Sequence, residues 1–371
     1  AEAAVKAIEV EWVNSKPSAL PSEAKKMLAP QVWSEKEHGD APTAQEAPGA
    51  PAFLFKWEGN VRGPGVFHSE EDYQAAQKAI ESAPVQVKFE GQTASQSHIP
   101  LEPHGCVVEV KGDELVMVAT TQTVKNLASD LADAFDWDDG KVKVIAPFVG
   151  GGFGAKATFR PEHLMATRLA MKTKRPVRLF YKLPEHVLLG GNRPGTQHRI
   201  EIGADEKGRI KNIVHHNESY CGAAIGETAS RMSQAHYPMA DVQGLDQNVV
   251  THTPPSCAFR APGHPPNAFA LEQAVQLLAS KTGKDPLSLR LENENRPRHR
   301  AVYELLRSKS PLLNQTLPPS EDPERYARGV GVATAEWFQM CAPNTKVHVE
   351  VLPKNEVLIS TGSQDMGQGT R

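Results

Sequence analysis

The spacing of apolar and polar residues predicts a chain that mixes helices and strands. Apolar residues recur at helical spacing over 124–135 and 267–281, and shorter helices are expected over 70–82 and 162–172. Strands are predicted where apolar residues alternate or run together, at 5–13, 85–90, 107–110, 115–120, 142–146, 177–181, 199–202, 210–215, 329–336, 347–352 and 357–360. This order of elements predicts an α+β fold with mixed sheets and helices.

Two stretches follow neither pattern. Residues 30–52 are rich in Pro, Ala, Gly and charge, which is typical of a long exposed connection. Residues 217–266 are rich in Gly, Pro, His and Ser, and such irregular backbone inside a domain often forms a binding surface. Both ends of the sequence read as interrupted elements, so we expect a fragment or a split-gene product.

Composition limits the classes of partner. The 371 residues carry a net charge of −3 at a pI of about 6.6, which leaves no electrostatic footprint for nucleic acid. The basic run at 296–300 follows Glu292 and Glu294 and reads as a solvated helix end. No apolar run approaches the ~20 residues that cross a bilayer, and we expect no secretory signal. The length predicts two or three domains.

The four cysteines stand alone in the sequence. No pair has C-x-x-C spacing, so we expect no iron–sulfur or zinc site built by this chain alone. They are Cys106, Cys221, Cys257 and Cys341.

A glycine-rich loop is expected between the strand at 142–146 and the helix at 162–172. Its sequence, VGGGFGAK, formally matches a dinucleotide fingerprint at Gly150-x-Gly152-x-x-Ala155. The fingerprint also needs an acidic residue at the end of the next strand, and the first acid there is Glu185. A triphosphate loop is excluded because Ala157 follows the lysine. From spacing alone, a tight turn, a dinucleotide loop and another loop of close approach stay open.

Two further loops carry residues suited to a binding site. One is PSCAFRAPG at 255–263, which places Arg260 in a Pro- and Gly-rich segment before the strongest predicted helix. The other is TGSQDMGQG at 361–369, where glycines permit close approach and Gln368 can donate and accept hydrogen bonds. Each of them alone is typical of a surface loop.

Taken together and in this order, the three loops resemble the molybdenum-binding catalytic subunit of the xanthine dehydrogenase and aldehyde oxidoreductase family, in its N-terminal part only. LEPHG at 101–105 and Thr121–Thr123 resemble motifs upstream in that family. The resemblance implies a partial α/β hammerhead-like domain with an exposed connection at 1–85. It implies a first molybdopterin-binding domain at 86–320 and a truncated second one at 321–371.

The resemblance implies oxidative hydroxylation of an aldehyde or an N-heterocycle, with water as the source of oxygen. The cofactor would be a molybdenum–pterin, with or without a cytosine dinucleotide. Electrons would leave to 2Fe-2S and FAD groups on a small and a medium partner subunit. The missing C-terminal half of the subunit would supply the general-base glutamate. A carbon monoxide dehydrogenase-like enzyme, an NAD-binding protein and an inactive fragment or scaffold are the alternatives.

Residue roles carry over from the same motifs. Arg260 would be catalytic, lying by the substrate and favouring developing negative charge. Gln122 would hydrogen-bond an oxygen ligand of the metal, and Phe153 and Gly154 would present backbone N–H groups beside Gly152. The implied pterin contacts are Gly367, Gln368 and Gly369, and the implied pocket residues are Ala157, Ala258, Phe259 and Pro262. Glu102 and His104 are expected to be structural.

Three positions depart from the family pattern. Ala157 stands where purine-oxidising members carry a glutamate, so purines are disfavoured. Pro262 replaces a pocket aromatic. Cys257 falls where the copper-containing members carry a cysteine, but its neighbours differ, and otherwise no side chain is expected to bind the metal directly. We expect the cytoplasm, with co-export to the periplasm through a partner as the alternative.

Overall fold

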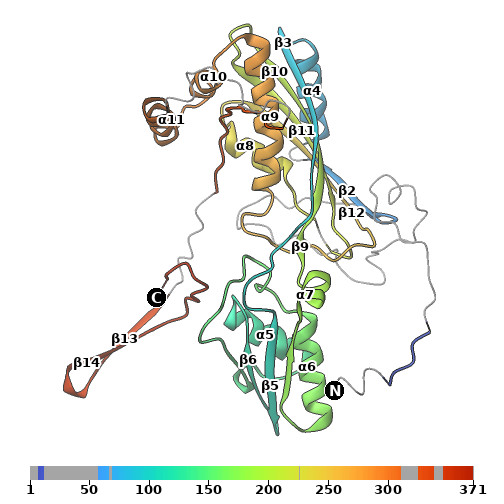
Figure 1. The fold of residues 1–371 in the computed structure, drawn as a ribbon, viewed down its shortest axis with the longest axis vertical. Helices are drawn as coiled ribbons and strands as arrows, with labels where there is room; N and C mark the ends of the chain where they lie inside the picture. The colour runs from blue at the N-terminus through green and yellow to red at the C-terminus, as the bar shows by residue number, and fades with distance from the viewer. Residues whose placement is uncertain are drawn as a thin grey trace.

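The chain folds into two lobes stacked along its long axis (Figure 1). A computed structural model describes residues 7–11, 57–66, 69–224, 226–310, 325–337 and 346–370. In this part of the chain, helices and mixed sheets alternate, which confirms the predicted α+β class.

The upper lobe is built on a mixed sheet. In the described residues its strands lie in the order β1 (Trp57–Glu58), β2 (Val61–Val66), β12 (Asp241–Val249), β11 (Ile210–Tyr220), β10 (Gly195–Ala204) and β3 (Val85–Thr93). Of these pairs, β11 and β12 run parallel and the others antiparallel. The predicted strands at 85–90, 199–202 and 210–215 are confirmed, and each extends further than expected.

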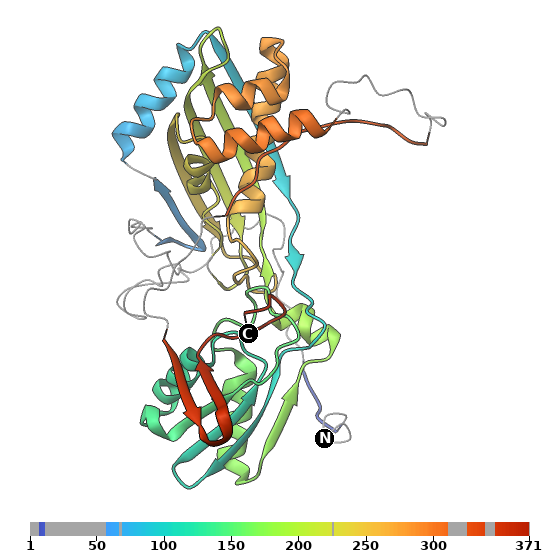
Figure 2. The ribbon, with the colours of Figure 1, turned by 90° about the vertical axis from the view of Figure 1, so that its left-hand side faces the viewer.

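Helices cover both faces of this sheet (Figure 2). Neighbouring residues of β11 point to opposite faces: Ile213 packs with α9 (His264–Thr282), and Val214 packs with α4 (Glu70–Glu81). Both helices are confirmed predictions. Because β2 and α4 join the same sheet as β10–β12, contacts cross the expected domain boundary at residue 85. That boundary stays a prediction.

The lower lobe is a smaller sheet with helices. The strand order is β7 (Val142–Ile145), β6 (Glu114–Ala119), β5 (Gly105–Lys111) and β8 (Val177–Phe180). The antiparallel pair β5–β6 is the hairpin that alternation predicts. The helices α5 (Val124–Phe135) and α6 (Pro161–Thr173) bury their apolar residues against it, including Leu127, Leu131 and Ala166. These elements confirm the predictions over 107–181.

Several elements differ from the expectation. Residues 329–336 form no strand: they run as irregular backbone, and the N–H of Thr334 is donated to Glu272. Residues 7–11 are also irregular, and the rest of the strand expected at 5–13 lies outside the described residues, as do residues 30–52. The stretch expected to be irregular, 217–266, contains the regular strand β12.

The basic run at 296–300 is not simply a solvated helix end. It opens α11 (Pro297–Lys309), which follows α10 (Pro286–Glu292). Arg296 donates to the carboxylates of Glu294 at 2.7 Å and Glu336 at 2.9 Å. Half-buried ion pairs therefore tie this helix start to the segment at 325–337.

The end of the described chain is a separate hairpin of β13 (Val347–Leu352) and β14 (Glu356–Thr361), as predicted. Side chains of Val349 and Ile359 are paired across it and are 58% and 64% exposed. A two-stranded hairpin with an exposed apolar face is only marginally stable alone. This face is left exposed by the described residues.

A chain of buried polar side chains crosses the upper lobe from β3 to α9. Each link is a hydrogen bond of 2.6–2.9 Å, and each group can donate one bond and accept the next. The residues are, in order, Thr93, Thr196, His198, His215, Ser233 and Asn267.

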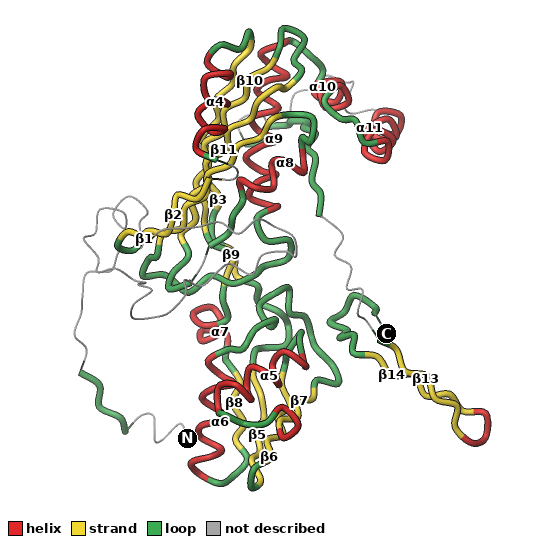
Figure 3. The backbone as a smooth tube through the Cα atoms, turned by 180° about the vertical axis from the view of Figure 1, so that it is seen from behind, coloured by secondary structure: helices red, strands yellow, loops and turns green. Residues whose placement is uncertain are grey.

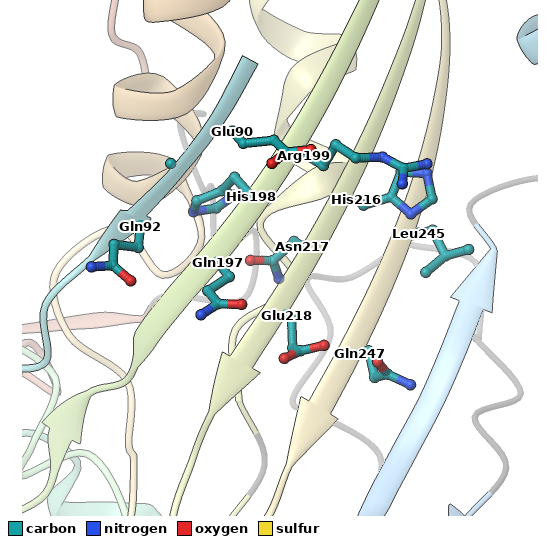
Figure 4. A pocket seen from close by; sticks show the side chains of 11 residues that line it. Glu90, Gln92, Gln197, His198, Arg199, His216, Asn217, Glu218, Leu245 and Gln247 are labelled. Atoms are coloured by element: carbon teal, nitrogen blue, oxygen red, sulfur yellow. The ribbon is translucent and has the colours of Figure 1, made fainter. Parts of the chain in front are cut away.

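A polar groove of about 550 Å³ lies on the face of the sheet that α4 covers, beyond the N-terminal end of that helix (Figure 4). Two rows of paired residues cross it: Glu90, Arg199, His216 and Leu245, and then Gln92, Gln197, Glu218 and Gln247. The Tyr73 hydroxyl, 2.6 Å from His216 Nε2, marks where α4 begins to cover the sheet.

Acid is expected to destabilise this fold from about pH 6.5 downwards. Burial lowers the pKa of several described histidines from 6.5 to about 4, namely His98, His163, His186, His198, His216 and His236. Between these two pH values the unfolded chain binds more protons than the folded one, so stability falls as pH falls and is constant above that window.

Thermal unfolding between pH 8 and pH 4 checks this. His236 is buried, and neither ring nitrogen hydrogen-bonds another described residue. His236→Phe should therefore flatten the slope of the unfolding temperature against pH below 6.5. An unchanged slope in the variant, or a flat wild-type curve, would contradict the account.

Candidate functional site

Loops from both lobes meet at the junction between them (Figure 3). The first is the glycine loop, residues 147–158, between β7 and α6. The side-chain oxygen of Gln122 accepts the N–H groups of Gly154 at 2.8 Å and Lys156 at 3.2 Å. A Cβ on Gly152 would lie 2.3 Å from that oxygen, so a larger residue there would displace the Gln122 side chain from its two hydrogen bonds. The fold thus brings together Gln122, Gly152 and Gly154.

One detail differs from the expectation. The N–H of Gly154, expected to face a ligand, is donated to Gln122. Of the two expected backbone donors, Phe153 and Gly154, only Phe153 remains for a ligand. Its φ is +55° and its side chain is half-exposed.

A buried lysine holds the glycine loop from beneath. The Nζ atom of Lys156 donates to the backbone oxygen of Glu102 at 2.9 Å and to its carboxylate at 2.8 Å. The same carboxylate accepts the N–H of Gly150. Burial lowers the pKa of Lys156, and the Glu102 carboxylate opposes that shift. Glu102 therefore has a structural contact, as expected from the sequence.

His104 also has a structural contact. Its Nδ1 lies 3.2 Å from Glu162 Oε1, and the Tyr181 hydroxyl donates to Oε2 of the same carboxylate. Burial alone raises the pKa of Glu162, but the hydrogen bond from His104 and the charge of His163 outweigh it and lower the pKa to about 2. A buried carboxylate thus anchors the start of α6.

The second loop, residues 254–263, is called here the arginine loop. A buried ion pair holds it: the Arg193 guanidinium lies 2.9 Å from Glu227 and donates to the backbone oxygens of Phe259 at 2.9 Å and Arg260 at 2.8 Å. The other Glu227 oxygen accepts the N–H of Gly263 at 3.0 Å. This pair fixes the backbone on both sides of the exposed Arg260 side chain.

The two loops touch. The N–H of Arg260 donates to the backbone oxygen of Phe153 at 2.8 Å. A Cβ on Gly154 would lie 2.3 Å from the backbone oxygen of Ala258, and the φ of Gly154 is +108°. The predicted residues 152–154 and 258–260 therefore form one site.

The loop at 362–370 approaches the same place (Figure 2). Gln364 Nε2 donates to the backbone oxygen of Ala146, just before the glycine loop, at 3.0 Å. Within the loop, the Asp365 carboxylate accepts the N–H of Gly367 at 2.8 Å, and the Gln368 side chain accepts the N–H of Met366 and donates to the backbone oxygen of Gln364. Gly367 and Gly369 face open space.

The remaining predicted residues lie around the loops. The backbone oxygen of Ala157 accepts from Thr123, and Pro262 is half-buried in the arginine loop. Cys257 Sγ lies 3.9 Å from His98 Nε2 and from the oxygen of Gly190. In the described part of the chain, no group of three or more His, Cys, Asp or Glu could hold a metal ion.

Sequence reasoning missed the residues that fix the site, namely His98, Lys156, Arg193 and Glu227. Arg193 and Phe259 are 66 positions apart, and no local pattern links them. The available signal is weaker: Arg193 and Glu227 are single charges in otherwise uncharged irregular segments, where burial requires a partner.

The topology argues against a dinucleotide loop. That fold needs the strands before and after the loop and helix to lie close together in a parallel sheet. Here β7 and β8 occupy opposite edges, with β6 and β5 between them. The helix α6 also starts at Pro161, well after the glycines.

Residues 60–294 match the family described as Molybdopterin cofactor-binding domain. The chain is 31% identical over 310 residues to the aldehyde oxidoreductase molybdenum-binding subunit PaoC of Escherichia coli O157:H7, covering 79% of this chain and 42% of that protein. It is 27% identical over 377 residues to a probable xanthine dehydrogenase subunit of Bacillus subtilis (strain 168), covering 94% and 49%.

The fold is similar to that of quinoline 2-oxidoreductase from Pseudomonas putida 86, with a TM-score of 0.74 and 19% identity, covering 99% of this chain and 49% of that one. The chain thus spans about half or less of the length of these proteins. No helix in the described residues is long and apolar enough to cross a membrane.

Proposed function

The chain belongs to the family of molybdopterin cofactor-binding domains, and from that premise we propose that it forms part of the active site of a molybdenum-dependent oxidoreductase. The reaction is oxidation of an aldehyde or an N-heterocycle, with water as the oxygen donor. The observation that carries this proposal is the convergence of Gln122, the glycine loop and the arginine loop at one point between the lobes.

The residues present fit a molybdenum–pterin group. The glycine loop exposes bare backbone. Gln122 packs closely against Gly152 and Ala258 against Gly154, which disfavours a side chain at either position. At 367 and 369, by contrast, the glycines have no atom within 4 Å of where a Cβ would stand, which suits close approach by a large ligand. The N–H groups of Met366, Gly367 and Gly369 are donated within the loop to Gln368 and Asp365, so the pterin contact proposed here rests on the open space at the two glycines.

The cofactor, when bound, supplies the two-electron oxidation chemistry. The protein would orient the cofactor and the substrate and polarise the reacting groups. Because Gln122 uses its side-chain oxygen on the loop, its Nε2 is the end that can donate to an oxygen ligand of the cofactor. The Phe153 N–H would donate alongside it. Arg260, with both flanking carbonyls fixed by its neighbours, would stabilise negative charge developing on the substrate oxygen or nitrogen.

The substrate proposal rests on the pocket residues. Ala157 offers no carboxylate to a purine, and Ala258 and Pro262 are small or rigid, while Phe259 presents a ring. An aldehyde or a small planar heterocycle suits such a pocket better than a purine does. The cofactor as a cytosine dinucleotide stays a proposal without a structural observation of its own.

Partners are part of the proposal. The chain has no C-x-x-C pair to hold iron–sulfur clusters, so electrons would pass to a 2Fe-2S subunit and an FAD subunit. The apolar face of the β13–β14 hairpin suits contact with the polypeptide that completes the subunit, which would also supply the general-base glutamate.

Metal and pterin analysis of the complete purified protein tests the function, together with dye-linked oxidation of aldehydes and N-heterocycles. We expect molybdenum and a pterin, with aldehyde or heterocycle oxidation. A tightly bound NAD without molybdenum would overturn the proposal. So would a protein that holds molybdenum and the pterin but oxidises neither class.

Arg260→Gln is expected to lower kcat/KM at least about tenfold, because a charge-assisted hydrogen bond to the substrate is lost. Its molybdenum content should stay at the wild-type level, since the Arg260 side chain is exposed and its backbone contacts are kept. Steady-state kinetics beside metal analysis check both. Full activity in this variant would remove Arg260 from the mechanism.

A further inference from the structure

His98 joins three segments at the edge of the site. It follows β4 (Gln96–Ser97), and its ring is buried at 6% exposure. Nε2 lies 2.8 Å from the backbone oxygen of Ala258, and Nδ1 lies 3.3 Å from the backbone oxygen of Gly191. Its ring also stacks on Phe259, with centroids 4.2 Å apart and planes 28° apart.

Each ring nitrogen of His98 lies within hydrogen-bond distance of a backbone oxygen, which can only accept, and the Cys257 thiol lies further from Nε2, at 3.9 Å. A neutral imidazole has one N–H, so it can bond only one of the two carbonyls at a time. Burial lowers the pKa of His98 to about 4, and the two carbonyls oppose that shift only in part. The ring is therefore neutral near pH 7, and the shorter distance assigns its proton to Nε2, which donates to Ala258.

The contact lies where the two site loops meet. The oxygen of Ala258 is also the atom that a Cβ at Gly154 would strike. Arg193 holds the oxygens of Phe259 and Arg260 from elsewhere, but makes no hydrogen bond to Ala258. Hence His98 supplies the hydrogen bond to Ala258, while the N–H of the preceding Cys257 donates to the backbone oxygen of Asn192.

We propose that His98 is a positioning residue that fixes Ala258 of the arginine loop and, together with the Arg193 guanidinium 4.9 Å from the ring centroid, sets the orientation of the Phe259 ring toward a planar substrate. This rests on the proposed function, because the substrate is what makes the ring orientation matter. Loss of His98 frees the backbone oxygen of Ala258 and one contact of the Phe259 ring, while Arg193 still holds the backbone oxygens of Phe259 and Arg260. Substrate binding then suffers more than the chemical step does.

Cys257 offers a direct report on the loop. Its Sγ is covered by residues 190–192, since a Cβ on Gly191 would lie 2.2 Å from it. Cys257 is half-buried and its Sγ also lies 3.9 Å from His98 Nε2, so its rate of reaction with N-ethylmaleimide reports how closely residues 98 and 190–192 pack on the loop. Cys106 and Cys221 are fully buried and report global unfolding in the same sample. Cys341→Ser removes the fourth thiol from the experiment.

The experiment measures the rate of maleimide labelling at each cysteine by peptide mapping in the complete protein, for wild type, His98→Ala, His98→Gln and His98→Asn. The amide nitrogen of glutamine can take the place of Nε2, and that of asparagine the place of Nδ1. We expect His98→Ala to label at Cys257 about tenfold faster, with Cys106 and Cys221 still protected. Glutamine should restore slow labelling, and asparagine should not.

Kinetics of the same variants give the second readout. KM should rise in His98→Ala with a much smaller change in kcat, and fall back in His98→Gln. His216 contacts Tyr73 and lies far from the arginine loop. His216→Ala should therefore leave the labelling rate of Cys257 unchanged.

Wild-type labelling in His98→Ala would overturn the inference, and so would equal rates in the alanine and glutamine variants, or faster labelling in His216→Ala. The labelling needs no molybdenum. A protein that lacks molybdenum but shows the expected labelling pattern would therefore contradict the proposed function while still supporting the contact between His98 and the loop.

Discussion

Gly154→Ala is expected to lose molybdenum and to lower kcat/KM by more than about 100-fold. The added Cβ would lie 2.3 Å from the backbone oxygen of Ala258, and the backbone there has φ of +108°, which alanine adopts only with strain. Neither neighbour can yield cheaply, because the Ala258 oxygen is held by His98 and the glycine loop by Gln122. The glycine loop and the arginine loop must separate, and the backbone surface that they form together is lost.

Metal analysis and steady-state kinetics of the variant check this prediction. Gly140→Ala is the matched control, since a Cβ there meets nothing within 4 Å and the backbone is not in the left-handed region. The control should behave as wild type. A Gly154→Ala protein with normal metal content and turnover would show that the loop contact has no bearing on the site.

Arg193→Met is expected to destabilise the fold by about 3–5 kcal/mol. The side chains of Arg193 and Glu227 are 4% and 6% exposed, so removing the guanidinium leaves a buried carboxylate and two carbonyls without their donors. Burial already raises the pKa of Glu227, while Arg193 holds it down. Without Arg193 the carboxyl group would therefore take up a proton more readily.

Urea unfolding of the complete protein measures this effect. Lys88→Ala breaks the exposed pair with Glu90, whose side chains are 58% and 64% exposed, and should change stability by less than about 0.5 kcal/mol. Arg193→Met/Glu227→Gln should recover part of the loss, because no unpaired charge remains buried. Equal unfolding midpoints for Arg193→Met and Lys88→Ala would refute the structural role of the pair.

The sequence predicts well those elements that bury apolar residues on one face and expose polar residues on the other. The apolar residues of α9, such as Leu271 and Leu278, recur at helical spacing because one face of the helix packs on the sheet. The strand β12 shows no such pattern because it buries polar side chains. Asp246 and Asn248 are 2% and 0% exposed, and their side-chain oxygens accept hydrogen bonds from Asn217 and Arg62, which are far away in the sequence.

The site divides in a similar way. Its loops can be found from the sequence because close packing requires glycine at fixed positions, as at 152 and 154. The residues that hold the loops cannot, because Arg193, Glu227 and His98 act on backbone atoms that any sequence would offer. Only the fold reveals such contacts. The division into domains at 85 and 320 likewise stays a prediction.

Anomalous diffraction at the molybdenum absorption edge, from crystals of the complete protein, tests the central claim most directly. The predicted result is a molybdenum peak at the junction of the lobes, within reach of Gln122, the glycine loop and Arg260. A peak elsewhere in the protein would contradict the account. So would nucleotide density in the glycine loop without molybdenum.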